Sequence, residues 1–210
     1  MSGVVVVDYG IGNVASVFNA LKRVGCEAKI VSTGVELAAL DPSKIILPGV
    51  GAIGRAMANL AERRLIEPLN ELVIARQRPF LGICVGMQVL TDHGEEFGQH
   101  ACLGWIPGAT SILAEPEKGI RLPHVGWNTI ESKEANGLFA GLPEYHFYFC
   151  HSYGVRCDDA DVIARCDYHG PFVAAIRRGN IHGVQFHPEK SSRAGEALLG
   201  NFIAMAATSC

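Results

Sequence analysis

The sequence predicts an α/β fold with a parallel central sheet flanked by helices and a smaller antiparallel sheet region in the second half. Over residues 4–91, short apolar runs alternate with segments of helical periodicity long enough for parallel crossovers. After residue 108, apolar runs follow one another with only Gly, Pro or polar breaks between them, as in antiparallel strands. No linker, repeat or low-complexity segment divides the chain, so we expect residues 1–210 to form a single domain.

Four strands are expected in the first half. Val4–Val7 is a continuous β-branched run, which is typical of a strand buried on both faces. The other three are Ala28–Val31, Ile45–Leu47 and Phe80–Ile83. Helices are expected over residues 13–24 (ended by Gly25), 35–40 (stopped before Asp41-Pro42), 53–77 (broken near Arg64) and 85–91.

In the second half, six short runs have strand character: residues 110–113, 124–130, 146–149, 162–166, 172–177 and 181–184. Residues 193–207 then show the periodicity of an amphipathic helix. These strands are the ones expected to extend the parallel sheet with antiparallel pairs.

Charge and hydropathy exclude several classes of partner. Eighteen basic and 21 acidic residues give a net charge of −3 without a basic block, which argues against nucleic-acid binding. The longest apolar stretch, Phe80–Leu90, is far shorter than the roughly 20 residues of a membrane span. The N-terminus has no positive region and leads directly into a strand, so we expect no signal peptide and no membrane partner.

Cysteine spacing indicates a reducing, cytoplasmic setting. The seven cysteines are an odd number, widely scattered and without a Cys-x-x-Cys pair. This fits neither a disulfide framework nor a structural zinc site. We therefore expect no metal and no cofactor, and most cysteines should be small buried hydrophobic residues. They stand at positions 26, 84, 102, 150, 157, 166 and 210.

Cys84 is the first candidate for chemistry. Gly82-x-Cys84-x-Gly86 has the spacing of a nucleophile elbow, in which a strand turns sharply into a helix and exposes the central side chain. A helix start also lowers the pKa of a thiol. The alternative is a buried structural cysteine in a glycine-rich packing turn.

His187-Pro-Glu189 supplies a base and a carboxylate. It follows the expected strand 181–184, and residues i and i+2 of an extended chain project to the same side. The imidazole can accept the thiol proton while the carboxylate orients the ring. A solvated turn is the alternative for this motif alone. A zinc deaminase is excluded because no Pro-Cys-x-x-Cys follows Glu189.

Two glycine patterns resemble dinucleotide-binding turns. Gly10-Ile-Gly12 follows the first strand, but the end of the second strand carries Ser32-Thr33-Gly34 where a ribose-binding acid is needed. Gly49-Val-Gly51-Ala-Ile-Gly54 follows the third strand and begins behind Pro48. Tight strand-to-helix turns are the preferred interpretation of both.

Motifs along the whole chain resemble one family. Gly-Ile-Cys-Val-Gly-Met-Gln around Cys84 and His187-Pro-Glu are similar to the triad motifs of class I glutamine amidotransferases, which have a flavodoxin-like fold. More narrowly, the sequence resembles the glutaminase subunits of imidazole glycerol phosphate synthases of histidine biosynthesis. This narrower likeness rests on Asp8-Tyr-Gly-Ile-Gly-Asn13, Pro48-Gly-Val-Gly51, Pro123-His-Val-Gly-Trp-Asn128 and His187-Pro-Glu-Lys-Ser191.

This resemblance implies roles for individual residues. Cys84 would attack the glutamine amide, His187 would protonate the leaving ammonia and Glu189 would orient His187. The backbone N–H groups of Val85 and Val50 would form the oxyanion hole, the latter within a loop whose glycines allow its peptide to flip. Substrate-binding positions would be Gly49, Gly51, Gln88, Glu96, Ser152 and Tyr153. For Gln88 and Glu96, an exposed helix face and a solvated acidic pair remain the alternatives.

A partner chain is implied as well, because 210 residues leave no room for an ammonia-accepting domain. By resemblance it is the (β/α)8-barrel cyclase subunit, which makes imidazole glycerol phosphate and AICAR. Interface or relay positions would be Asn13, Trp127, Asn128, Tyr148, His151 and Lys190, although Trp127 is also interpretable as a core aromatic. Two other hypotheses stay open: a stand-alone cysteine hydrolase and a non-catalytic binding subunit.

Overall fold

The computed structural model describes residues 3–113, 121–134 and 136–206. Over these residues five parallel strands have the order β2-β1-β3-β4-β13. They are β1 (Val4–Val7), β2 (Ala28–Val31), β3 (Lys44–Gly49), β4 (Phe80–Cys84) and β13 (Ile181–Val184). The predicted parallel central sheet is confirmed. Its strand order is that of flavodoxin-like folds, in which ligands bind outside the carboxyl ends of the strands.

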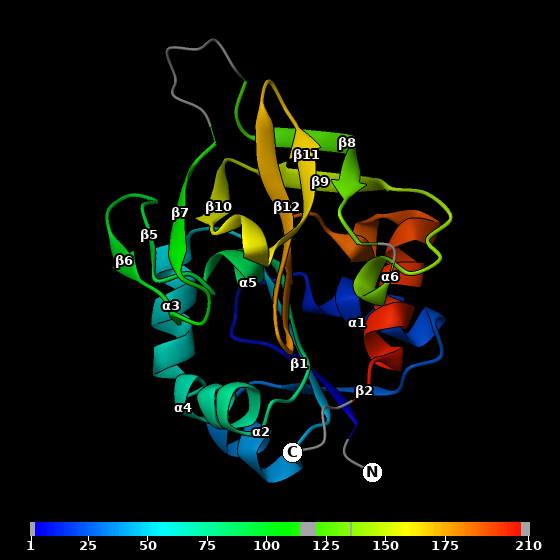
Figure 1. The fold of residues 1–210 in the computed structure, drawn as a ribbon. Helices are drawn as coiled ribbons and strands as arrows, with labels where there is room; N and C mark the ends of the chain where they lie inside the picture. The colour runs from blue at the N-terminus through cyan, green and yellow to red at the C-terminus, as the bar shows by residue number, and fades with distance from the viewer. Residues whose placement is uncertain (1–2, 114–120, 135, 207–210) are drawn as a thin grey trace.

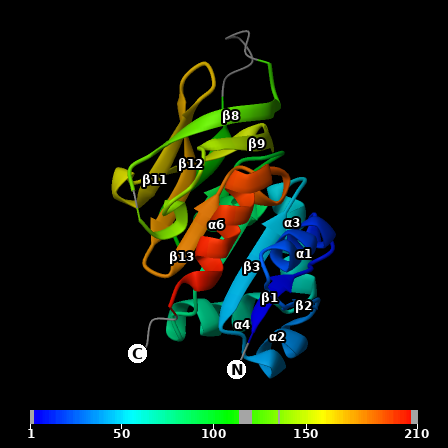
Figure 2. The same ribbon diagram turned by 90° about the vertical axis from the view of Figure 1, so that its right-hand side faces the viewer.

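Four antiparallel strands continue this sheet beyond β13. In order they are β12 (Pro171–Arg178), β11 (Val162–Asp167), β8 (His124–Ser132) and β9 (His146–His151). Strands β8 and β9 lie side by side at the upper end of the molecule in both Figure 1 and Figure 2. Most of the predicted antiparallel region therefore extends the central sheet.

A smaller second sheet has the order β10-β7-β5-β6. Its strands are β10 (Tyr153–Cys157), β7 (Gly108–Ile112), β5 (His93–Gly94) and β6 (His100–Ala101), and β5 pairs with β7 in parallel rather than antiparallel. Strands β5, β6 and β10 are absent from the sequence prediction. Two-residue strands carry no readable alternation, whereas β10 alternates Tyr153, Val155 and Cys157 with Gly154 and Arg156, a strand pattern that the prediction missed.

Helices cover both faces of the central sheet, as the nearly edge-on view in Figure 1 shows. Helices α1 (Val14–Arg23) and α6 (Ser192–Ala204) pack together on one side. On the other side lie α3 (Ile53–Glu62) and α4 (Ile66–Asn70), with α2 (Gly34–Leu40) and a π-helical segment, Glu71–Ala75, packed against α4. The predicted break near Arg64 is confirmed, with a φ of 54° at that residue. Ala207, where the last helix was expected to end, lies outside the described residues.

Short 3-10 turns complete the described elements: Gly137–Phe139, Asp159–Asp161 and Pro188–Lys190. The last one follows β13 and leads into α6, so it lies at the carboxyl edge of the sheet.

Helix α1 shows why the helical periodicity could be recognised in the sequence, because its apolar positions Val14, Val17 and Leu21 are all buried. Its two basic last-turn residues, Lys22 and Arg23, also suit the negative end of a helix.

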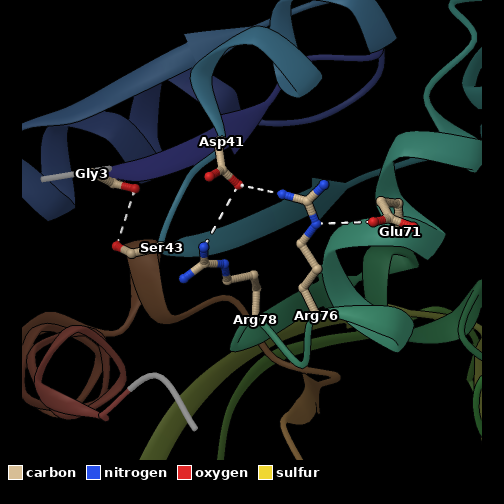
Figure 3. A network of polar contacts seen from close by, with 6 residues as sticks. All are labelled: Gly3, Asp41, Ser43, Glu71, Arg76 and Arg78. Atoms are coloured by element: carbon tan, nitrogen blue, oxygen red, sulfur yellow. Dashed lines mark hydrogen bonds and ion pairs between the residues drawn. The ribbon is translucent and has the colours of Figure 1, made fainter. Parts of the chain in front are cut away.

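Figure 3 shows a polar network around Asp41, which follows α2. Asp41 Oδ1 lies 3.3 Å from Arg76 Nη1 and 3.7 Å from Arg78 Nη2, and Arg76 Nε donates to Glu71 Oε1 at 2.9 Å. Arg78 precedes β4 at the end opposite to Cys84. The side chains of Asp41, Glu71 and Arg76 are about half exposed, so their ion pairs contribute little stability.

Gly86 permits the close approach of the first turn of α5 (Val85–Gln88) to strand β3. A Cβ at this position would collide with the backbone carbonyl oxygen of Leu47, and a Cβ at Gly82 would collide with that of Gly86. Neither glycine has a positive φ; Cys84 itself carries the unusual backbone angle. The glycines of the Gly-x-Cys-x-Gly motif are therefore needed for close packing, which differs from the expected role in a sharp turn.

Replacing Gly86 by Ala is expected to destabilise the protein by about 1–3 kcal/mol, as overpacking of a rigid core does. Urea unfolding with an unchanged m-value measures the loss. Gly200→Ala in α6 is the matched control. A Cβ there has nothing within 4 Å and only adds helix propensity, so stability should rise slightly. Equal stabilities of the two variants would contradict this interpretation of Gly86.

Candidate active site

Cys84 sits where β4 ends, in a strained backbone conformation. Its φ is 55° and its ψ −110°, a region that non-glycine residues rarely occupy and that occurs preferentially at functional sites. The side chain is buried, and Gly49 at the end of β3 pairs with it across the sheet. The local geometry is thus that of a nucleophile elbow.

Helix α5 is shorter than the sequence indicates. It spans only Val85–Gln88 instead of reaching Thr91. The hydroxyls of Thr91 and Thr110 both donate to the Gln88 carbonyl oxygen at 3.0 Å, which satisfies the end of the helix and diverts the chain. A single turn has a small dipole, so the helix start contributes less to thiol activation than expected.

His187 and Glu189 meet beside the thiol. His187 Nδ1 lies 2.9 Å from Glu189 Oε1, and the Cys84 thiol lies close enough to the imidazole to act on its pKa. Both side chains are buried. The chain is extended at His187, but Pro188–Lys190 forms a 3-10 turn, so the carboxylate reaches the ring through a turn and not along the extended chain that the i, i+2 spacing predicts.

Hydrogen bonds to Ser191 and Tyr148 fix the backbone at His187. Ser191 Oγ donates to the His187 carbonyl oxygen at 2.6 Å, and His187 N–H donates to the Tyr148 carbonyl oxygen at 2.9 Å. Burial acts to lower the pKa of His187, but hydrogen bonds with Cys84 and Glu189 and their negative charges outweigh it and raise this pKa to about 10. The site therefore favours the protonated imidazolium form of His187.

A cavity of about 140 Å³ opens beside Cys84. It brings together most of the residues expected at the active site and substrate site. Its lining residues are Val50, Gly51, Cys84, Val85, Gln88, Glu96, Cys150, His151, Ser152, Tyr153, His187 and Lys190. Gly49 does not line the cavity; it is buried and pairs with Cys84 across the sheet. The lining holds one thiol paired with a base, an acid and several polar groups, which suits a small polar substrate.

Gln88 and Glu96 both have specific partners. Gln88 is 3% exposed, and its Nε2 donates to the Tyr153 carbonyl oxygen at 2.9 Å and to Gln185 Oε1 at 3.1 Å. The exposed-helix interpretation of Gln88 is therefore wrong. Glu96 is half-buried, and its Oε2 accepts the Ile53 N–H at 2.9 Å, which satisfies the start of α3. Its carboxylate also borders the cavity.

In the loop after β3, the two glycines differ. Gly51 has a φ of 85° and no atom within 4 Å of a built Cβ, so its conformation requires glycine while its surroundings leave it free to move. Gly49 is tightly packed, because a Cβ there would collide with the Tyr9 hydroxyl and lie 2.8 Å from Gly86 N. Freedom of this loop therefore resides in Gly51 alone. The buried Tyr9 hydroxyl, which has no hydrogen-bond partner among the described residues, lies below the loop.

His124 and Gln185 were not among the sequence candidates, although both belong to the site's polar network. His124 Nδ1 and His151 Nε2 are 3.3 Å apart, and His151 Nδ1 donates to the Tyr153 carbonyl oxygen at 2.8 Å. Asn128 Nδ2 reaches His124 Nε2 at 3.5 Å. The Pro-His-x-Gly-Trp-Asn motif contains His124, and Gln185 stands two residues before His187, but only the contacts in the folded chain show that both belong to this network.

Three histidines are buried in neutral form. Burial lowers the pKa of His124 to about 4 and that of His182 to about 4. Burial and the charges of His124 and His187 lower the pKa of His151 to about 3, although its hydrogen bond to Tyr153 acts to raise it. Each has an ordinary pKa near 6.5 when unfolded. Between pH 6.5 and about 4 the unfolded chain therefore binds more protons than the native one.

Stability is expected to fall as pH drops below 6.5, by up to about 1.4 kcal/mol per histidine for each pH unit. His187 does not offset this, because its raised pKa leaves it protonated in both states over this range. Urea midpoints measured from pH 6.5 to 5 test the expectation. His182→Asn removes one titrating group and should flatten the slope by about a third; an identical slope in that variant would contradict the assignment.

Several expected partner residues gather beside the cavity mouth. Trp127 on β8 is 46% exposed and pairs with Tyr148 on β9, their rings 6.3 Å apart. Lys190 Nζ lies 5.5 Å from the centroid of the Tyr148 ring. The core-aromatic interpretation of Trp127 is therefore wrong. An exposed Trp next to a Tyr and a Lys has the composition of an interaction surface.

The other expected interface residues are less exposed. Asn13 is half-buried at the start of α1, and its side chain makes no capping bond there. Asn128 is half-buried and donates to the Asp167 carbonyl oxygen at 2.8 Å. His151 is 5% exposed, so it cannot touch a partner directly and stays a relay candidate.

The described residues contain no metal cluster, no disulfide and no membrane-spanning helix. They contain no group of three or more His, Cys, Asp or Glu side chains placed to hold a metal ion. Their six cysteines are free thiols, and Cys210 lies outside the described range. None of the helices in these parts of the chain combines the length and apolar character needed to cross a bilayer.

Comparisons with known proteins agree with this geometry. The family model "Glutamine amidotransferase class-I" matches residues 5–206. Two solved structures share the fold. PurLQS from Thermotoga maritima has a TM-score of 0.74 and is 21% identical, with 97% of this chain and 98% of that chain covered. A glutamine amidotransferase has a TM-score of 0.73 and is 22% identical, with 95% of this chain and 99% of that chain covered.

Curated relatives are closer in sequence. "Imidazole glycerol phosphate synthase subunit HisH" of Rhodospirillum rubrum is 42% identical (95% of this chain, 97% of the relative). The subunits of the same name from Vibrio cholerae and Desulfitobacterium hafniense are 45% (95% and 97%) and 46% identical (94% and 92%). With the elbow cysteine, the His–Glu pair and these similarities together, the chain belongs to the class I glutamine amidotransferases and, within them, to the family of imidazole glycerol phosphate synthase HisH subunits.

Proposed function

We propose that this chain hydrolyses glutamine to glutamate and ammonia through Cys84, His187 and Glu189. It passes the ammonia to a (β/α)8-barrel cyclase subunit that makes imidazole glycerol phosphate and AICAR in histidine biosynthesis. The observation that carries the proposal is the buried Cys84–His187–Glu189 arrangement at the wall of a polar cavity. Residues 1–210 act together as one glutamine amidotransferase domain.

The reaction has two covalent steps. Cys84 Sγ, as thiolate, attacks the side-chain amide carbon of glutamine, and His187 gives its proton to the departing nitrogen, so that ammonia leaves and a thioester remains. A water molecule then attacks the thioester, with His187 taking its proton, and glutamate and the thiolate are released. The N–H groups of Val85 and Val50 stabilise the oxyanion in both steps. Glu189 keeps the imidazole oriented and stabilises its charge.

Glutamine is held at its amino-acid end by groups on the cavity wall. Glu96 pairs with its ammonium, and Ser152 and Tyr153 bind its carboxylate. Gln88 has its amide nitrogen engaged twice, which leaves its oxygen to accept a hydrogen bond from substrate. Gly49 and Gly51 shape the loop that closes over the amide.

Glu96→Gln is expected to raise the KM for glutamine about tenfold while kcat changes little, because a charge pair with the ammonium is lost and the chemistry is untouched. The Gln oxygen can still accept the Ile53 N–H, so unfolding stability should stay near that of the parent. Glu95→Gln, at the exposed neighbour, is the control. A fall in kcat without a change in KM would place Glu96 elsewhere in the mechanism.

The barrel partner docks on the surface formed by Trp127, Tyr148 and Lys190, beside the cavity mouth. Exposed aromatic residues are favoured anchors of interfaces. Ammonia released at Cys84 then has a protected route to the acceptor, whereas ammonia in water becomes protonated and diffuses away. In this proposal Asn13 and Asn128 contribute to the same interface, and His151 acts as a relay between the interface and the cavity.

Glutamate release, measured with and without the barrel subunit carrying its acceptor substrate, tests the proposal. Stimulation by the loaded partner, lost in Trp127→Ala, is the expected result. Rapid glutaminase activity of the isolated chain that the partner does not change would favour the stand-alone hydrolase. Absence of glutamate under both conditions would favour the non-catalytic subunit.

A further inference from the structure

Gln185 contacts both Cys84 and Gln88 and has no role in the proposed mechanism so far. It follows β13 and precedes His187 by two residues. The residue is fully buried, and its backbone N–H donates to the Ala174 carbonyl oxygen at 2.9 Å, which fixes the chain at this point. A side-chain amide buried this deeply is costly unless its polar atoms have partners.

The partners of Gln185 determine how its amide is oriented. Gln88 Nε2 donates to the Tyr153 carbonyl oxygen at 2.9 Å, so this end of Gln88 must be the nitrogen. Its second partner, 3.1 Å away, must then be an acceptor, which is Gln185 Oε1. The Gln185 Nε2 group consequently faces Cys84 Sγ at 3.7 Å, within hydrogen-bonding range of sulfur.

We propose that Gln185 is a positioning residue for the Cys84 thiolate, donating an N–H to Sγ while its oxygen fixes the amide of Gln88. The inference deepens the proposed function and rests on it. A donor to sulfur stabilises the charged form of the thiol and restricts the direction of its lone pairs. Because the Gln185 amide contacts both Cys84 and Gln88, it fixes the position of the Cys84 sulfur relative to the Gln88 oxygen that binds substrate.

A neutral amide suits this position better than the other polar side chains. The thiol already faces the imidazole of His187, with the Tyr9 hydroxyl close enough to interact electrostatically with it and Lys190, Glu96 and Tyr153 on the cavity wall. A carboxylate of the same shape as Gln185 could not donate to sulfur and would repel the thiolate. An apolar side chain would leave the Gln88 amide without one of its two acceptors.

The test follows alkylation of Cys84 by iodoacetamide against pH in the full chain, read site by site by peptide mass spectrometry. This needs no glutamine turnover, so it separates failure of this inference from failure of the proposed function. In Gln185→Glu, the pH of half-maximal reaction should rise by about one unit or more, as loss of a hydrogen bond to a charged group implies. In Gln185→Met, which adds no charge, it should rise less.

Asn180→Asp is the matched control, since that amide binds the Val73 and Arg78 carbonyl oxygens at the far end of the sheet and its variant should leave the profile unchanged. Thermal unfolding shows whether each variant folds. If Gln185→Glu does not fold, the test relies on Gln185→Met. Both folded Gln185 variants should also raise the KM for glutamine, through Gln88. An unchanged alkylation profile in both would overturn the inference, even if KM rose.

Discussion

Cys84→Ala is expected to lower glutamine hydrolysis by about 10⁴-fold or more, because loss of the nucleophile removes the covalent pathway. The fold should persist. Both residues are small, the side chain is buried, and Ala meets the same backbone strain at a φ of 55° that Cys does. Steady-state glutamate release and circular dichroism measure the two effects.

Cys166→Ala is the control for this substitution. Cys166 is as buried as Cys84, but burial and the charge of Asp167 raise its pKa to about 12, so its thiol stays protonated and unreactive. Glutaminase activity should be unaffected in this variant. Retained activity in Cys84→Ala, or its loss in Cys166→Ala, would remove Cys84 from the proposed mechanism.

Gly51→Pro is expected to depress partner-stimulated turnover by about 100-fold, the loss that follows removal of an oxyanion donor. Proline fixes φ near −65°, whereas Gly51 has a φ of 85°, and it also restricts Val50 before it. Proline also removes the N–H of residue 51 and fixes the peptide between residues 50 and 51, so the loop can no longer adjust to present the Val50 N–H to the oxyanion. Glutamine binding, measured with the Cys84→Ala background to prevent turnover, should change little.

Gly51→Ala distinguishes loop geometry from a general disturbance. It has open space around its Cβ and keeps the N–H, so it changes only the preference for positive φ and should cost no more than about tenfold. The partner can shift the loop only through contacts that differ between its two states, and Lys190, which borders the cavity beside Tyr148, is placed to transmit them. Normal stimulation in Gly51→Pro would require a different switch.

Much of the fold could be predicted from local patterns. The continuous β-branched run Val4–Val7 and the stop of the helical pattern near Arg64 carry their information in neighbouring residues, and both predictions are confirmed. Strands β5 and β6 exist only through their partners in the second sheet, and two residues hold no period to read. The end of α5 depends on Thr110, which is 22 residues away from the carbonyl it satisfies.

In the candidate site, too, some residues could be recognised from local motifs and others only from contacts in the folded chain. Cys84, His187 and Glu189 stand in short motifs whose spacing has chemical meaning, so they could be selected before any contact was known. The roles of Gln185, His124 and Tyr9 arise from side chains that meet across strands, and no spacing in the chain specifies those meetings. Glu189 does contact His187, but through a 3-10 turn and not along the extended chain that the spacing predicts.

Covalent capture of the substrate tests the central claim most directly. The chain is incubated with a glutamine analogue carrying an electrophilic carbon at the amide position, and the label is located by peptide mass spectrometry. The account predicts one label per chain, on Cys84, with glutamine protecting against it and with no label in Cys84→Ala. Labelling of another residue, or glutamate formation by a chain whose Cys84 is fully blocked, would contradict it.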